Sequence, residues 1–139
     1  MTIFKIKVLA SDHVFYEGDV EAITLTTVDG EMGILANHEE MVIGIVPGEL
    51  RITTGTQERI VAASGSGFAK VQKDGVIVLV SSAERPEEID ELRALEAKER
   101  ALEQLKHKED LKEFHRSRAA MARALSRLDI INKYGSKKI

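Results

Sequence analysis

The chain has 139 residues, of which 43% are hydrophobic and 31% are charged, and it contains no cysteine. This length suits one domain with a small appendage, and the lack of cysteine excludes disulfides, thiolate catalysis and cysteine-ligated metals. No apolar run approaches the roughly 18 residues that a membrane-spanning helix needs, so the composition predicts a globular protein that does not itself cross a membrane.

The net charge of −3 hides a gradient along the chain. Residues 1–86 carry a balance of −5, residues 87–110 one of −4, and residues 111–139 one of +6. A basic end favours binding to nucleic acid, to an anionic surface or to an acidic protein partner. The plainer alternative is a helix face that is only solvated.

The first part of the chain has the periodicity of strands. Apolar and polar side chains alternate over residues 3–8 and again over residues 21–26, as expected for strands with one buried face. Turn dipeptides separate such runs at Asp29-Gly30, Pro47-Gly48, Thr54-Gly55 and Asp74-Gly75. Many short strands separated by turns predict a β-sandwich domain over residues 1–85.

The periodicity changes at Pro86. Residues 87–134 contain neither glycine nor proline, and the acids that follow Pro86 suit the positive end of a helix dipole. Two apolar stripes then recur at a spacing of three and four residues, and each needs a packing partner. The stripes are Leu92, Leu95, Leu102 and Leu105, and then Leu111, Phe114, Met121, Leu125 and Leu128.

A polar stretch over residues 106–110 separates the two stripes and predicts a turn, where Asp110 and Glu113 have the spacing of a capping box. The two helices then form an antiparallel hairpin within residues 86–139. One long helix is the alternative, because the stretch lacks glycine and proline. The predicted fold class is α+β, an N-terminal β-sandwich followed by a C-terminal antiparallel two-helix hairpin.

The residues give little support to a catalytic or metal site. The histidines, at positions 13, 38, 107 and 115, never have the spacing that places two on one helix face. The glycine-rich stretch Ser64–Phe68 lacks the lysine of a phosphate-binding loop and leads into a strand pattern. Glu39 and Glu40 point to opposite faces of an extended chain, which makes a poor acid–base pair. We therefore expect no metal, no catalysis and an interaction module.

The basic end does not favour nucleic-acid binding, because few aromatic side chains accompany its arginines. An acidic protein partner explains the charge equally well. Two alternatives stay open on the residues alone. A free-standing adaptor or nucleic-acid binding module predicts retention of the isolated chain on polyanions, and an enzyme predicts turnover by the isolated chain.

Five motifs occur in one order along the chain: "TTVDGEMGILANH", "VPGELRI", "GSGFAKV", "SSAERPEEIDELRA" and "RAAMARALSRL". Together they resemble, in order and spacing, the epsilon subunit of bacterial F-type rotary ATP synthases, over residues 3–128. The resemblance implies the same sandwich and hairpin. It also implies a non-catalytic central-stalk subunit that couples ion flow to ATP synthesis and restrains ATP hydrolysis.

The partners that the resemblance implies are the gamma subunit, the membrane c-ring and the catalytic alpha and beta subunits, without nucleic acid. The subunit would lie at the cytoplasmic face of the cell membrane, attached only through the complex. Glu31 and His38 correspond to positions that face the c-ring. Here Ala36 replaces a common proline and Glu39-Glu40 replaces a common Ala-Pro, so the loop loses rigid positions and gains charge.

The hairpin carries two further implied roles. Its basic side chains Arg116, Arg123 and Arg127 suit an inhibitory contact with the acidic segment of the beta subunit. The segment "IDELRA" fits the Ile/Leu-Asp-x-x-Arg-Ala motif of epsilon subunits that bind ATP. No cofactor is required, but a regulatory ATP would hold the hairpin folded. The alternative is that the acid and arginine of the motif form only a surface pair. The implied nucleotide-binding residues are Glu84, Ile89, Asp90, Arg93, Ala94, Arg123 and Arg127.

Overall fold

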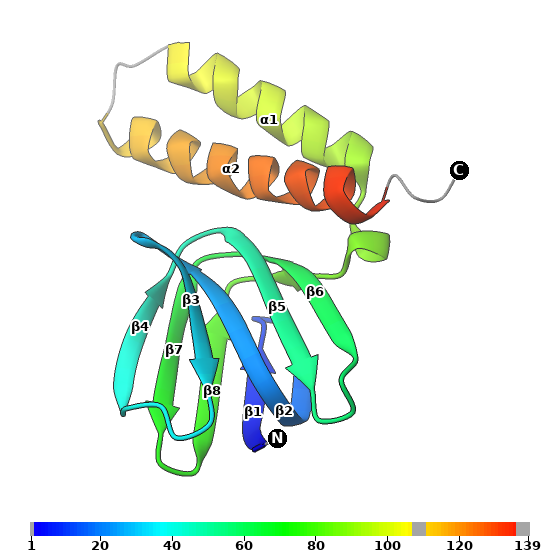
Figure 1. Cartoon of the computed structure of the whole chain (residues 1–139). Coiled ribbons are helices and arrows are strands. Elements are labelled where there is room, and N and C mark those ends of the chain that lie inside the picture. The colour runs from blue at the N-terminus through cyan, green and yellow to red at the C-terminus, as the bar shows by residue number, and fades with distance from the viewer. Residues whose placement is uncertain (1, 107–110, 136–139) are drawn as a thin grey trace. The chain divides into compact units, whose positions relative to one another are not determined.

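The computed structural model describes residues 2–106 and 111–135 (Figure 1). The chain divides into two compact units, residues 1–85 and 86–139. Strands make up the first unit, and the second contains the two helices (Figure 1).

The strands of the first unit form two layers that share one long strand. Among the described residues, the strand order is β4-β7-β8-β1-β2-β5-β6-β9, with β3 beside β2. The first half of β2 pairs with β1, and its second half pairs with β3 and β5. The strands are β1 (Phe4–Leu9), β2 (Val14–Thr27), β3 (Gly30–Leu35), β4 (Met41–Ile45), β5 (Gly48–Thr54), β6 (Arg59–Ser64), β7 (Gly67–Gln72), β8 (Gly75–Val80) and β9 (Ala83–Glu84).

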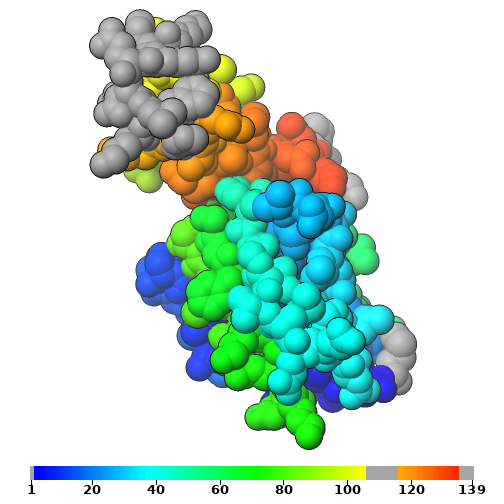
Figure 2. All heavy atoms as spheres, turned by 90° about the vertical axis from the view of Figure 1, so that its left-hand side faces the viewer, coloured from blue at the N-terminus to red at the C-terminus, as the bar shows by residue number. Residues whose placement is uncertain are grey.

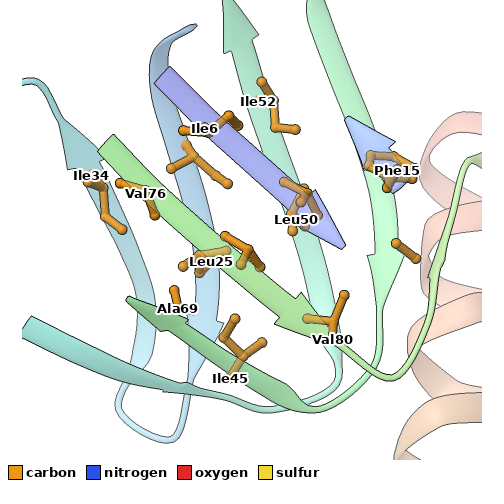
Figure 3. Close-up of a cluster of buried hydrophobic side chains, with 14 of the residues drawn as sticks. Ile6, Phe15, Leu25, Ile34, Ile45, Leu50, Ile52, Ala69, Val76 and Val80 are labelled. Atoms are coloured by element: carbon orange, nitrogen blue, oxygen red, sulfur yellow. The ribbon is translucent and has the colours of Figure 1, made fainter. Parts of the chain in front are cut away.

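The core lies between the two layers (Figure 3). Alternate residues of the strands point into it, so that Ile23 and Leu25 of β2 and Leu50 and Ile52 of β5 are fully buried. Each such side chain contributes roughly 1.5–3 kcal/mol through burial. The predicted β-sandwich is confirmed, because alternation along the strands supplied two apolar faces that bury each other.

Glycines stand where the predicted hairpins reverse. Gln72 pairs with Gly75 across the two-residue turn between β7 and β8. A side chain at Gly75 would overlap the backbone oxygen of Lys5 on the neighbouring strand β1. Gly30 has a φ of 115° at the turn between β2 and β3, a conformation that L side chains rarely adopt.

The second unit contains a short 3₁₀ turn, two helices and a π-helical turn. These are η1 (Pro86–Glu88), α1 (Glu91–Lys106), α2 (Leu111–Ile130) and η2 (Ile131–Gly135). The helices lie antiparallel and side by side (Figure 1). The fold class predicted from the sequence is confirmed, whereas the predicted turn with its capping residue Asp110 falls on residues 107–110, outside those that the structure describes.

Small side chains, and not the predicted leucine stripes, make the centre of the helix–helix contact. Each helix has two buried small residues that lie seven positions apart. They are Ala94 and Ala101 on α1, and Ser117 and Ala124 on α2. Ser117 Oγ donates a hydrogen bond to Gln104 Oε1 across the hairpin at 2.9 Å. Small residues let two helix backbones approach closely, which leaves larger side chains on the flanks. The prediction that the stripes form the packing face is wrong for Leu92, Leu95, Leu102 and Leu125, which are 42–66% exposed.

Candidate functional site

Glu31 stands near the start of β3, and its carboxylate is ion-paired. Its Oε2 lies 2.7 Å from Nη2 of Arg51 on β5. Nη1 of the same guanidinium donates a hydrogen bond to the buried carboxylate of Glu49. The hydrogen bond to Glu49 raises the pKa of Arg51 above its usual range, so the guanidinium is charged at any physiological pH. Residues 49 and 51 were not predicted, since only strand pairing brings them to Glu31.

His38 follows the end of β3 and lies seven residues beyond Glu31. Its Nδ1–H donates a hydrogen bond to the backbone oxygen of Glu39 at 2.9 Å, so Nε2 is the acceptor in the tautomer that carries one ring proton. β3 ends at Leu35, and a turn at residues 36 and 37, where Asn37 has a φ of 65°, comes before His38. The structure therefore places one predicted rotor contact near the start of β3 and the other in the loop that follows this strand, and no hydrogen bond or ion pair joins them among the described residues.

An apolar patch covers part of the outward face of the layer that contains β4, β7 and β8. It consists of Val42, Phe68, Ile77 and Leu79, which are 37–64% exposed, and the exposed Lys70 stands among them, paired with Val42 on one side and with Ile77 on the other. Cross-strand pairing sets Phe68 between Leu79 on β8 and Gly44 on β4. β4 and β7 lie side by side in Figure 1, and their cyan and green surface faces the viewer in Figure 2. We call these four residues the apolar face, and exposed apolar patches of this kind mark protein contacts.

Asp90 caps the N-terminus of α1. Its Oδ1 accepts the backbone N–H of Arg93 at 3.1 Å, and its backbone oxygen accepts that of Ala94 at 3.0 Å. The Asp90 carboxylate and the Arg93 guanidinium lie 3.9 Å apart, both largely exposed. Such a cap contributes about 1 kcal/mol to helix stability, and the exposed pair a few tenths. A cap, a surface pair and a buried alanine thus account for the Asp-x-x-Arg-Ala spacing without any ligand.

The remaining predicted nucleotide residues divide between the two units. Arg123 and Arg127 lie one turn apart on α2, both half-buried, in the same unit as the capped helix. Ile89 is half-buried between η1 and α1. Glu84 belongs to β9 of the first unit. Six of the seven predicted residues therefore belong to the helical unit, and Arg116 of the inhibitory set is exposed on α2.

Over residues 2–106 and 111–135, no three or more histidine or acidic side chains gather where they could hold a metal ion. In those ranges neither helix has both the length and the hydropathy of a membrane span.

Two family models match the chain in succession. Residues 3–86 match the beta-sandwich domain of the ATP synthase delta/epsilon chain, and residues 87–132 match its long alpha-helix domain. The junction of the two matches coincides with the change from strands to helices.

Individual relatives cover nearly the whole chain. The ATP synthase epsilon chain of Caldanaerobacter subterraneus subsp. tengcongensis is 46% identical over 94% of this chain and 95% of its own length. That of Caldicellulosiruptor bescii is 44% identical over 94% of both chains.

Solved structures agree with these relatives. A chain of the Euglena gracilis mitochondrial ATP synthase (OSCP/F1/c-ring, rotational state 1) superimposes with a TM-score of 0.78 at 26% identity, over 93% of this chain and 81% of that one. One from the central stalk and c-ring of the Tetrahymena thermophila enzyme shares the fold, with a TM-score of 0.53 at 16% identity over 61% of this chain and 68% of that one. The family models, the curated relatives and the fold agree, and this chain belongs to the epsilon-chain family of ATP synthase subunits.

Proposed function

We propose that this epsilon subunit joins the central stalk of a bacterial rotary ATP synthase, couples ion flow through the c-ring to ATP synthesis, and restrains ATP hydrolysis through its helical hairpin. It is non-catalytic and lies at the cytoplasmic face of the cell membrane, attached only through the complex. The observation that carries the proposal is the match of both domains, in order, to epsilon chains. Neither a free adaptor nor an enzyme accounts for that match.

The apolar face supports docking of the sandwich on the gamma subunit. Three of its four side chains, Phe68, Ile77 and Leu79, come from the paired strands β7 and β8. Gly44 pairs with Phe68, and a Cβ added at Gly44 would meet no atom within 4 Å, so that position is open to a partner. An exposed apolar surface of this kind, with one lysine in it, suits a partner that buries its own apolar side chains there.

Replacing Gly44 by glutamate tests this docking surface. We expect Gly44→Glu to weaken binding to ATP synthase that lacks this subunit by at least about tenfold, because it buries a charge and a large side chain within the contact. Gln72→Glu is the matched control, since it adds the same charge at the polar end of β7. Binding is measured by titrating labelled chain onto the depleted complex. Equal losses from both variants would contradict docking through the apolar face.

The c-ring contact is proposed for Glu31 and His38. Because Glu31 lies near the start of β3 and His38 in the loop that follows it, such a contact would extend along this strand. In the described part of the chain, β3 pairs only with β2 and so forms an edge of its layer. The polar loops of a c-ring offer hydrogen-bonding groups to a carboxylate and to the acceptor Nε2 of the histidine.

Inhibition of ATP hydrolysis is proposed to require an open hairpin. In that state Arg116, Arg123 and Arg127 would meet the acidic segment of the beta subunit. The small side chains buried in the hairpin support this, since alanine and serine contribute little apolar area, and Ile130 is the one large side chain that is fully buried among the described residues of the two helices.

A regulatory ATP is proposed to bind the folded hairpin selectively and so oppose inhibition. Arg123 and Arg127 of α2 would bind the phosphates. Asp90 and Arg93, at the start of α1, would contact the same nucleotide. A contact of Asp90 with nucleotide would come in addition to its capping of α1, which exists without nucleotide.

Calorimetric titration with ATP and magnesium checks the nucleotide site. We expect millimolar or tighter binding by the unmodified chain and at least about tenfold weaker binding by Arg127→Ala, because a charge-assisted hydrogen bond to phosphate is lost. Arg116→Ala serves as the control on the same helix. Absence of heat from the unmodified chain, or equal binding by Arg127→Ala, would rule out this site.

A further inference from the structure

The hairpin of β2 and β3 carries Glu31 just beyond its turn. Thr27 closes that turn: its Oγ1 donates to the backbone oxygen of Gly30 at 2.8 Å and accepts the N–H of Asp29 at 3.2 Å. None of these bonds involves the Glu31 carboxylate, and the Glu31 side chain is 52% exposed. The side chain that contacts the carboxylate is Arg51 of β5, the strand on the other side of β2.

We propose that Arg51 is the positioning residue for Glu31 and holds its carboxylate in the orientation in which the subunit meets the c-ring. This inference rests on the proposed rotor contact of Glu31. It adds a residue of β5 to a contact that the sequence motifs assign only to β3 and the loop after it.

Strand register puts the guanidinium in place. Thr24 of β2 pairs with Arg51 on one side, and Thr26 pairs with Glu31 on the other. Residues that pair directly share a face of the sheet. Arg51 therefore crosses β2 diagonally, a span that suits a long side chain, and its Nη2 reaches Glu31 Oε2 at 2.7 Å.

Glu49 holds the other side of the guanidinium. It stands two residues before Arg51 on the same strand, so both side chains leave the same face. Its side chain is only 8% exposed and accepts the hydrogen bond from Nη1. Its backbone oxygen also accepts Thr26 Oγ1 at 2.9 Å, which ties β5 to β2 at this point.

The planar guanidinium is what makes this arrangement specific. Arg51 binds its two carboxylates through different nitrogens in one plane and is 26% exposed. A lysine carries one nitrogen on a flexible stem and would keep the charge without holding both carboxylates in one geometry. Arg51→Lys therefore separates positioning from charge.

A double-mutant cycle on binding tests the proposal, with the chain titrated onto complete ATP synthase from which this subunit has been removed. We expect Glu31→Gln to weaken binding about tenfold and Arg51→Lys about fivefold. In the Glu31→Gln background, Arg51→Lys should add less than about twofold, because Arg51 acts through the carboxylate that is already lost. Arg59→Gln, an exposed position of the same layer, is the control and should stay within about twofold of the unmodified chain.

Each outcome decides the question. Equal losses from Arg51→Lys in both backgrounds, or no loss from either single change, overturn the role of Arg51. Failure of the unmodified chain to bind overturns the proposed function itself and this role with it. Melting curves accompany every variant. If Arg51→Lys does not fold, the double variant Glu49→Gln with Arg51→Gln, which removes the buried charges together, replaces it in the same cycle.

Discussion

Gly67→Ala is expected to destabilise the sandwich by about 3 kcal/mol or more, an effect at the upper end for a single methyl group. The added Cβ would overlap the backbone oxygen of Leu79 and lie 2.8 Å from the Cα of Val80, both on the paired strand β8. Backbone atoms of a strand cannot turn aside as the end of a flexible side chain does. Urea unfolding followed by far-ultraviolet circular dichroism measures the loss.

Gly44→Ala is the matched control for this change. Gly44 lies on β4, which pairs with β7, yet an added Cβ there meets no atom within 4 Å. We expect its free energy of unfolding to stay within about 0.5 kcal/mol of the unmodified chain. Equal stability of the two alanine variants would show that β7 and β8 do not approach each other as the structure has them.

Ala124→Leu is expected to push the two helices of the hairpin apart. Ala124 is fully buried beside the small residues of the helix contact, and an extra branched side chain in such a contact costs about 1–3 kcal/mol. A cost of about 2 kcal/mol shifts the ratio of closed to open hairpins by roughly 30-fold. Spin labels at Glu91→Cys and Asp129→Cys report the separation, and the lack of native cysteine keeps the labelling specific.

If the open hairpin inhibits ATP hydrolysis, opening it should also change the hydrolysis rate of the assembled enzyme. An ATP synthase carrying Ala124→Leu should hydrolyse ATP more slowly, and alanine at Arg116, Arg123 and Arg127 in the same chain should restore the rate. Ala119→Leu is the control, because Ala119 is exposed on the same helix. Faster hydrolysis with Ala124→Leu would contradict the proposed open inhibitory state, whatever the label distances show.

The β-sandwich and the helical region could be predicted because their signals are local. Alternation over a few residues decides which side of a strand is apolar, and glycine at position 30 permits a backbone conformation that other residues rarely adopt. The family resemblance was recognisable for the same reason, since each of its motifs lies within one stretch of chain. The cap of α1 was not predicted, because the acids after Pro86, Asp90 among them, indicate only a match to the helix dipole, whereas Asp90 caps α1 one residue before that helix begins.

The contact between the two helices could not be predicted. Helical periodicity identifies an apolar face of one helix, but not which residues of that helix contact its partner. The leucines repeat at helical spacing, yet Ala94 and Ala101 repeat as well, seven residues apart, on a neighbouring face. Close approach of two helices favours the smaller side chains, and this preference depends on the partner helix. Sequence periodicity alone therefore did not separate the packed positions from the exposed leucines.

Sequence by itself determined that this chain has a β-sandwich and two helices, and that it resembles an epsilon subunit, because these properties follow from neighbouring residues and ordered motifs. Only the tertiary structure decided which distant residues share a site. Arg51 reaches Glu31 because β2 pairs with both β3 and β5, and Glu31 and His38 are separated because an extended strand runs between them. Hydrogen-bonded pairing between strands sets the first result, and no local pattern encodes its register.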